Sequence, residues 1–294
     1  MERDTTAPPG AAVGAVDGGP LVDGGPDAGA VKACCAAVYQ SDWARLLLGD
    51  SFHPGGLGLT ERLGQALELG AGRRVLDVAA GKGASAIHLA QRFGCEVVGV
   101  DYGGDAIREA TSAAERAGVA HLVHFEQGDA ERLAQPDAAF DAVICECAFC
   151  TFPDKAAAAR EFARVLRPGG RVGLSDITRN GPLPPALDGL LAWVACVADA
   201  RPVAEYVRYL EVAGLMVERV EPHDEALSAL LRDVRAKLMA AELLVKLRKI
   251  ALPAVDFDQA RTMARAAADA VGAEVLGYAL ITAASAPAVR PSEA

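Results

Sequence analysis

The feature that most constrains the fold is a regular alternation of apolar strand-like stretches and helical stretches. The strand-like stretches occupy residues 73–79, 95–101, 121–129, 140–146 and 169–177. The helical stretches between them occupy residues 85–93, 105–118 and 154–166. Strands that alternate with helices of this length form βαβ units, so the pattern predicts a parallel sheet with helices on both faces. The strands are apolar along most of their length, as expected of strands buried on both sides.

After residue 177 the pattern changes. Residues 183–213, 224–250 and 257–271 have helical character, whereas 214–222 and 275–283 read as two more strands. These two strands would extend the same sheet. The sequence therefore predicts an α/β fold with a mostly parallel seven-stranded sheet, flanking helices and a helical cover formed by residues 183–213.

Composition limits the class of partner. The chain has 294 residues, of which 52% are apolar, so it can bury a large core. Its formal charge of −10 makes a nucleic acid an unfavourable partner. No apolar run reaches the roughly 18 residues of a membrane-spanning helix, so no membrane partner is expected.

The N-terminal residues 1–30 are rich in Gly, Pro, Ala and Asp and lack the basic start and apolar core of a secretory signal. We expect them to form a disordered tail. Seven cysteines, an odd number, in a chain without an export signal indicate reduced thiols and a cytoplasmic location.

A glycine-rich turn, Asp77-Val78-Ala79-Ala80-Gly81-Lys82-Gly83, falls where the first strand meets the first helix. Glycines at this place let the backbone approach a ligand closely, and the helix N-terminus favours negative groups. Asp101 ends the second strand, where an acid can accept hydrogen bonds from ribose hydroxyls. The turn predicts a nucleotide-like cofactor, and a dehydrogenase would also show such a turn.

Three further features of the sequence argue against a dehydrogenase. The turn reads D-x-A-x-G-x-G, Gly128-Asp129-Ala130 follows the third strand, and Arg167-Pro168-Gly169-Gly170 precedes the fifth. Together they resemble the class I S-adenosylmethionine (SAM)-dependent methyltransferases over roughly residues 57–285, with their Rossmann-like fold. The resemblance implies that SAM is bound by Asp77, Ala79, Gly81, Gly83, Asp101, Tyr102, Asp129, Ala130 and Cys145. The family more often has glycine at position 79.

The run Val143–Phe152 carries three cysteines, Cys145, Cys147 and Cys150, at the end of the fourth strand. In such a sheet this strand end points into the crevice where ligands bind. Cys196 lies in the predicted cover, and Cys34-Cys35 lie ahead of the sheet. Three segments can therefore bring thiols to one pocket, which suits a soft acceptor such as trivalent arsenic.

The segment around Cys147, with P-D-K and R-V-L-R-P-G-G after it, is similar to the arsenite methyltransferases. So is C-V-A-D-A…Y-V-R-Y-L-E-V-A-G-L, which begins at Cys196. The resemblance implies that Cys147 and Cys196 bind arsenic and that Cys34 or Cys35 supplies the third thiol, with Cys35 placed in the arsenic site. The family has asparagine where this chain has Glu146.

The sequence thus predicts a SAM-dependent methyltransferase that acts on a thiol-bound arsenite or methylarsenite, with a thiol reductant such as glutathione or thioredoxin as partner. Two alternatives stay open: methyl transfer to a small organic thiol, amine or hydroxyl with Glu146 at its centre, and a metalloid- or metal-binding protein on the same scaffold. The predicted organisation is a tail (1–30), an N-terminal helical cap (31–58), a SAM-binding core (59–180) and a cover that completes the sheet (181–294).

Overall fold

The computed structural model describes residues 53–187, 196–197, 199–247 and 256–287, together with Gly29 and Lys32. Apart from Gly29, the predicted tail lies outside the described residues, and so do Cys34 and Cys35. Most of the predicted cap also lies outside them, and so do residues 188–195 and 198 of the predicted cover.

One sheet of seven strands organises the chain, as the sequence predicts, in the order β3-β2-β1-β4-β5-β7-β6. All neighbouring strands are parallel except β7, which runs antiparallel to both β5 and β6. The strands are β1 (Arg74–Val78), β2 (Glu96–Asp101), β3 (Val123–Gln127), β4 (Phe140–Glu146), β5 (Leu166–Arg179), β6 (Leu215–Pro222) and β7 (Leu276–Ser285). Strand β5 begins three residues earlier than predicted, because Leu166 already pairs with Phe140 of β4.

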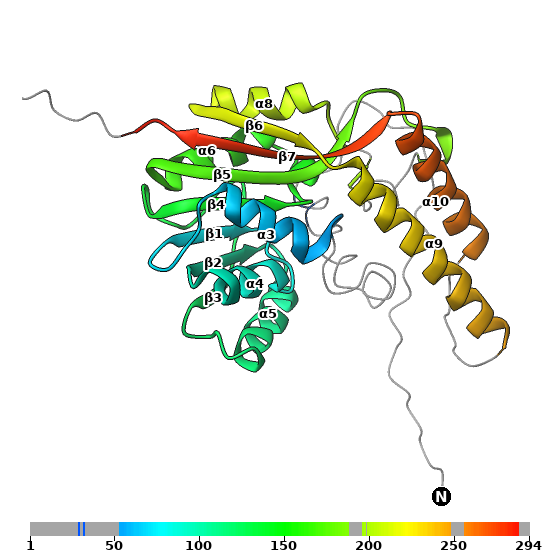
Figure 1. The fold of residues 1–294 in the computed structure, drawn as a ribbon, viewed down its shortest axis with the longest axis horizontal. Coiled ribbons are helices and arrows are strands. Elements are labelled where there is room, and N and C mark those ends of the chain that lie inside the picture. The colour runs from blue at the N-terminus through cyan, green and yellow to red at the C-terminus, as the bar shows by residue number, and fades with distance from the viewer. Residues whose placement is uncertain are drawn as a thin grey trace, which may run out of the picture.

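Helices cover both faces of the sheet (Figure 1). On one face, α4 packs against α3 and α5, and on the other α6 packs against α8. The bounds are α3 (Gly56–Ala66), α4 (Ala84–Phe93), α5 (Gly104–Arg116), α6 (Lys155–Val165) and α8 (Val203–Val212). This three-layer arrangement buries the central strands on both sides, which is why β1 and β4 are almost continuously apolar.

Helix α8 is the part of the predicted cover that the structure describes as a helix, and it lies in the helix layer on α6 and β6. Helices α9 (Asp224–Lys246) and α10 (Phe257–Gly272) pack against each other. They follow the end of β6 and precede the start of β7, at the edge where the parallel strands end (Figure 1). None of the described helices is both long and apolar enough to cross a membrane.

The packing of β2 against Phe125 gives a first test. A Cβ added to Gly99 would lie 2.3 Å from the Phe125 ring, whereas one added to Gly58 on α3 would meet no atom within 4 Å. We expect Gly99→Ala to lower the free energy of unfolding by about 1–3 kcal/mol, because the buried ring has to move. Gly58→Ala, in an exposed helix position, should instead raise it by roughly 0.5–1 kcal/mol. Urea denaturation measures both, and equal effects would contradict the packing described.

Candidate active site

The predicted cofactor loop is held by Asp101, the acid at the end of β2. One carboxylate oxygen of Asp101 accepts the Gly81 N–H at 2.8 Å, and the other accepts the Gly103 N–H at 2.8 Å. Burial raises the pKa of Asp101, and the two backbone bonds partly oppose the rise. The carboxylate therefore fixes the loop after β1 to the loop after β2, while its remaining lone pairs can accept hydroxyl groups.

The loop backbone follows a path that favours glycine. Gly81 and Gly83 have φ of +52° and +79°. A Cβ on Gly83 would lie 2.4 Å from the Phe125 ring, so only glycine fits there. Ala79 also has a positive φ, +62°, which gives a physical reason for the family's glycine at this position. A Cβ on Gly81 would meet nothing within 4 Å, so its surface is open to a ligand.

Asp77, at the end of β1, has a carboxylate that suits a cationic ligand. It is buried, and its Oδ2 atom has no hydrogen-bond partner. Burial raises its pKa well above the usual range, and the nearby Glu146 and Asp101 add to the effect. An isolated buried carboxylate is costly, and a positively charged group beside it would offset that cost. The ammonium group of SAM is such a group, so Asp77 and the glycine loop fit the predicted cofactor.

Asp129, which the resemblance implies in SAM binding, forms an ion pair with a lysine. The Lys32 ammonium lies 2.8 Å and 2.9 Å from the two carboxylate oxygens of Asp129 and 2.5 Å from Glu131. Tyr102 directly follows β2, and its side chain is exposed. Ala130 lies in the loop after β3. Lys32 was not identified from the sequence, because no motif marks a lysine that reaches residues about 100 positions away.

Glu146, at the end of β4, lies in a compact polar cluster. Its carboxylate accepts hydrogen bonds from Ser85 Oγ at 2.6 Å and Thr60 Oγ1 at 3.0 Å, and lies 3.6 Å from His53 Nε2. Ser175 lies 3.5 Å away and receives the hydroxyl hydrogen bond of Tyr278 at 3.0 Å. The Glu146 side chain is 4% exposed, so hydroxyl donors replace the water that would otherwise solvate it.

Cys147 and Cys196 come together although 49 positions separate them. The Cys196 Sγ donates to the Cys147 carbonyl oxygen at 3.3 Å. The hydrogen bond with Cys196, followed by burial, raises the pKa of the Cys147 thiol well above its usual range. Both cysteines have a left-handed backbone, with φ of +53° and +60°. Such conformations are costly for residues with a Cβ and cluster at functional sites.

The segment that carries Cys196 is fastened to the end of β5. The Arg179 N–H donates to the Arg201 carbonyl at 3.0 Å, and the buried Tyr206 hydroxyl donates to the Ile177 carbonyl at 3.0 Å. Asp199 forms ion pairs with Lys155 of α6 and with Arg201. Lys155 is almost fully buried, and its ion pair with Asp199 replaces its hydration. These anchoring residues were not identified from the sequence, because charged residues in loops are most often solvated.

Asp176, near the end of β5, lies against the thiols. Its carboxylate accepts the Cys150 N–H at 2.9 Å and the Ile177 N–H at 2.8 Å. Burial, followed by the neighbouring Cys196, raises the pKa of Asp176 to about 7. The carboxylate thus holds the turn after β4 against the end of β5.

The remaining predicted thiols differ in position. Cys145 is fully buried within β4, and its pKa is raised well above the usual range by burial and by Asp176. Cys95 is also a core thiol, as expected, and donates to the Leu89 carbonyl at 3.6 Å. Among the described residues, no three His, Cys, Asp or Glu side chains are already arranged to hold a metal ion.

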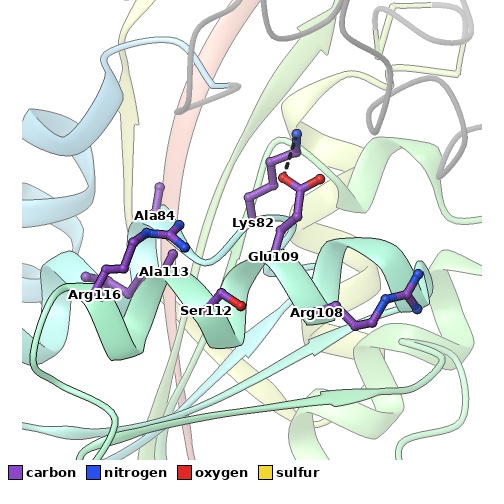
Figure 2. A pocket seen from close by; sticks show the side chains of 8 residues that line it. Lys82, Ala84, Arg108, Glu109, Ser112, Ala113 and Arg116 are labelled. Carbon is purple, nitrogen blue, oxygen red and sulfur yellow. Dashed lines mark ion pairs between the residues drawn. The ribbon is translucent and has the colours of Figure 1, made fainter.

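A separate surface cavity of about 570 Å³ lies between α4 and α5 (Figure 2). Its wall includes the ion pair of Lys82 with Glu109, at 3.0 Å, and the side chains of Arg108 and Arg116. None of the predicted site residues lines it. The cavity is therefore distinct from the strand edge that carries Glu146 and Cys147.

Comparison with known proteins agrees with this geometry. A family model described as a methyltransferase domain matches residues 69–214. The matched residues are thus similar to a methyltransferase domain, and β6 and β7, which complete the sheet, lie beyond them. The fold also matches a Haemonchus contortus phosphoethanolamine N-methyltransferase 2 solved with SAM, with a TM-score of 0.73 and 18% identity over 87% of this chain and 60% of that one. A methyltransferase domain takes its methyl group from SAM, and the glycine loop, Asp77 and Asp101 fit that cofactor.

Curated relatives act on different acceptors. A 27-O-demethylrifamycin SV methyltransferase of Amycolatopsis mediterranei is 36% identical over 55% of this chain and 61% of that protein. An arsenite methyltransferase of Halobacterium salinarum is 32% identical over 53% of this chain and 40% of that protein. The chain spans less than two thirds of the length of the curated relatives it matches first.

The loop-holding role of Asp101 is testable. Asp101→Asn leaves one oxygen for two backbone N–H groups and removes the charge. Because a hydrogen bond to a charged group contributes about 1.5–3 kcal/mol, we expect the affinity for S-adenosylhomocysteine to fall roughly 10- to 100-fold in calorimetric titration. Asp105→Asn, which changes an exposed carboxylate of α5, is the matched control. Equal affinities for the two variants would contradict this role.

The raised pKa of Asp176 predicts a pH dependence of stability. In the unfolded chain this carboxyl ionises near its ordinary pKa of 3.8, whereas in the folded protein its pKa is about 7. The folded state therefore keeps a proton that the unfolded state has lost, so its contribution to stability is full below about pH 4 and falls as the pH rises to 7, by up to about 1.4 kcal/mol per pH unit. Asp176→Asn should flatten this slope in urea denaturation at pH 5–7. An unchanged slope would show that Asp176 ionises normally.

Proposed function

We propose that the protein transfers a methyl group from SAM to a trivalent arsenical held by the thiols of Cys147 and Cys196. The observation that carries the proposal is the contact between two cysteines from distant segments after the end of β4, where the Cys196 Sγ lies 3.3 Å from the Cys147 carbonyl oxygen. Both thiols sit on left-handed backbone, a conformation that packing alone does not require of cysteine.

The chemistry of the pair suits a soft, neutral acceptor. Thiol sulfur binds soft metal and metalloid centres in preference to hard ones. Each As–S bond can form while the proton of a thiol leaves with an arsenic-bound hydroxyl as water. Cys196 is buried and Cys147 half-buried, so little water competes for the arsenic. Glu146 nearby would repel an anionic arsenical but tolerates a neutral one such as As(OH)₃.

The transfer step needs no general base, because the arsenic nucleophile carries no proton. Bound SAM supplies a methyl group on a positively charged sulfonium. The arsenic lone pair forms the new As–C bond, while the electrons of the broken C–S bond return to sulfur. The contribution of the protein is to orient the arsenic and to exclude water.

The electron balance requires a reductant. Arsenic gives both electrons of its lone pair to the As–C bond and becomes formally pentavalent. Release of two sulfur ligands as one disulfide returns two electrons to arsenic. A thiol reductant such as glutathione or thioredoxin then supplies two electrons and two protons to restore the thiols.

A second candidate rests on the polar cluster around Glu146. Its carboxylate and the neighbouring His53 are buried beside hydroxyl groups, and either can accept a proton from an amine or hydroxyl acceptor. The similarity to a methyltransferase of demethylrifamycin is compatible with such an acceptor. In this reaction the thiols would have no chemical role, so substitution of the cysteines distinguishes the two candidates.

The test incubates the purified protein with SAM, glutathione and arsenite and separates arsenic species by chromatography with mass detection. We expect methylated arsenic from the wild type. Cys147→Ser and Cys196→Ser should each lower the rate by at least roughly 10- to 100-fold, because each removes a sulfur ligand.

Cys95→Ala is the matched control, since Cys95 is a core thiol remote from β4, and it should keep the wild-type rate. Absence of methylated arsenic, with SAM bound normally, would overturn the arsenical proposal. Wild-type rates of methyl transfer to an amine or hydroxyl in the two serine variants would favour the second candidate.

A further inference from the structure

Helix α9 has apolar side chains on two opposite faces, and one of these faces packs against the rest of the protein. Leu227, Leu238 and Ala241 form this inner face and are buried, where α9 contacts α10 and β7. Their spacing places them on one side of the helix. The inner face thus fixes α9 on the protein and directs the opposite face outward.

The outward face carries an apolar stripe along the second half of α9. This outer stripe consists of Ala236, Met239, Ala240, Leu243 and Leu247, which follow one another at helical spacing and are all exposed. Met239, Leu243 and Leu247 keep 66%, 56% and 58% of their surface accessible. At the rise of an α-helix the stripe is about 17 Å long. Figure 1 shows α9 running from the end of β6 away from the sheet, so the stripe lies at the periphery. A continuous exposed apolar surface of this kind marks an interaction site.

Basic residues border the outer stripe. Arg232 and Arg235 are exposed one turn before it, and within the described part of the chain neither forms an ion pair. Lys246 lies beside it and is 70% exposed, although its ammonium is 2.6 Å from Glu242. Residues 231–250 contain six basic and two acidic residues, a net charge of +4 in a chain whose total is −10. The outer stripe therefore lies in a locally positive part of an acidic protein.

The two acids of this segment are already neutralised. Asp233 pairs with Lys237 at 2.7 Å, and Glu242 pairs with Lys246 and also with Arg261 of α10. Neither carboxylate is left to attract a cationic partner. The charge on this face of α9 therefore favours a partner that is anionic.

The same charges argue against a second copy of this chain as the partner. Two such helices packed in parallel would place Arg232 and Arg235 against their own copies. Antiparallel packing would place them against Lys246 of the other copy. Both arrangements bring like charges together, which weakens association.

We propose that the outer stripe and its basic border bind the surface of an anionic lipid bilayer, with α9 lying in the interface. Interfacial helices bury an apolar face at the boundary of headgroups and acyl chains, and their Lys and Arg side chains contact anionic headgroups. The outward face of α9 has both features. In the sequence Arg248 and Lys249 follow Leu247, so cations border the stripe at both ends, as suits a surface with anionic groups all round.

This binding does not depend on which acceptor receives the methyl group. It differs from the sequence-based expectation of no membrane partner, because that expectation rested on the length needed to span a bilayer. A helix that lies in the interface needs no such length. The finding that no described helix can cross a membrane is compatible with it.

The test measures co-sedimentation of the full chain with lipid vesicles. Vesicles of phosphatidylcholine alone are compared with vesicles that also contain phosphatidylserine. We expect stronger binding to the second kind, because each Lys or Arg near an anionic surface strengthens binding about 5-fold. An increase in ionic strength from about 0.1 M to about 1 M should release most of the protein, because the screening length falls from about 10 Å to about 3 Å.

Two double variants separate the apolar and the electrostatic contributions. Leu243→Ser/Leu247→Ser should lower the affinity for phosphatidylserine vesicles by roughly 10-fold or more, because two leucines no longer enter the interface. Arg232→Gln/Arg235→Gln should lower it by roughly 10- to 30-fold, because two cations are lost. All four side chains are exposed, so neither change disturbs the inner face of α9.

Met216→Ser and Arg160→Gln are the matched controls, since they change an exposed apolar residue of β6 and an exposed arginine of α6. Both should bind vesicles like the wild type. Unchanged affinity for S-adenosylhomocysteine shows that each variant is folded. If Leu243→Ser/Leu247→Ser lost that affinity, Met239→Ser provides a second test, and vesicle binding equal to that of the wild type would then overturn the inference.

Three other results would overturn it as well. One is a wild-type protein that does not bind phosphatidylserine vesicles, and another is equal vesicle binding by the wild type and both double variants. The third is a dimer, detected by sedimentation equilibrium, that Leu243→Ser/Leu247→Ser dissociates, because the outer stripe would then bind a second copy of the chain.

Discussion

The parallel register of β1, β4 and β5 is the constraint on which the site depends. Asp77 pairs with Ile144, and Glu146 pairs with Ser175, so the carboxyl ends of β1 and β4 meet beside Ser175 of β5 at one edge of the sheet. The pairing is held by burial of both sheet faces under helices, and it leaves polar groups only where the strands end. The cofactor loop, the Glu146 cluster and the thiol segment all start from this edge.

Several costly features gather at that edge. Asp77 and Asp176 are buried carboxyl groups with raised pKa values, and Cys147 and Cys196 have left-handed backbone. Each of these lowers stability, and the surrounding core has to offset the loss. Their concentration at one edge, beside a well-packed sheet, is the arrangement expected of a site that binds and positions a ligand.

The strand–helix alternation predicts the seven-stranded sheet, because burial on both faces leaves a continuous apolar signature in each strand. The glycine turn and Asp101 are predictable for a similar reason, since a positive φ and a close approach to a ligand restrict the residue type. The Lys155–Asp199 ion pair and the Lys32–Asp129 ion pair were not predictable, because a charged residue shows no sign in the sequence of a partner on another element.

The cysteines likewise show which features the sequence determines and which depend on the tertiary structure. The sequence by itself determined that Cys147 directly follows a central strand and that Cys196 follows the fifth, because strand periodicity and order are local properties of the chain. Only the tertiary structure decided that the Cys196 Sγ lies 3.3 Å from the Cys147 carbonyl oxygen. That contact depends on Asp176 holding the turn after β4 against the end of β5, and on how the segment after residue 196 folds back onto the strand. Such contacts arise from packing between distant segments, which residue order does not specify.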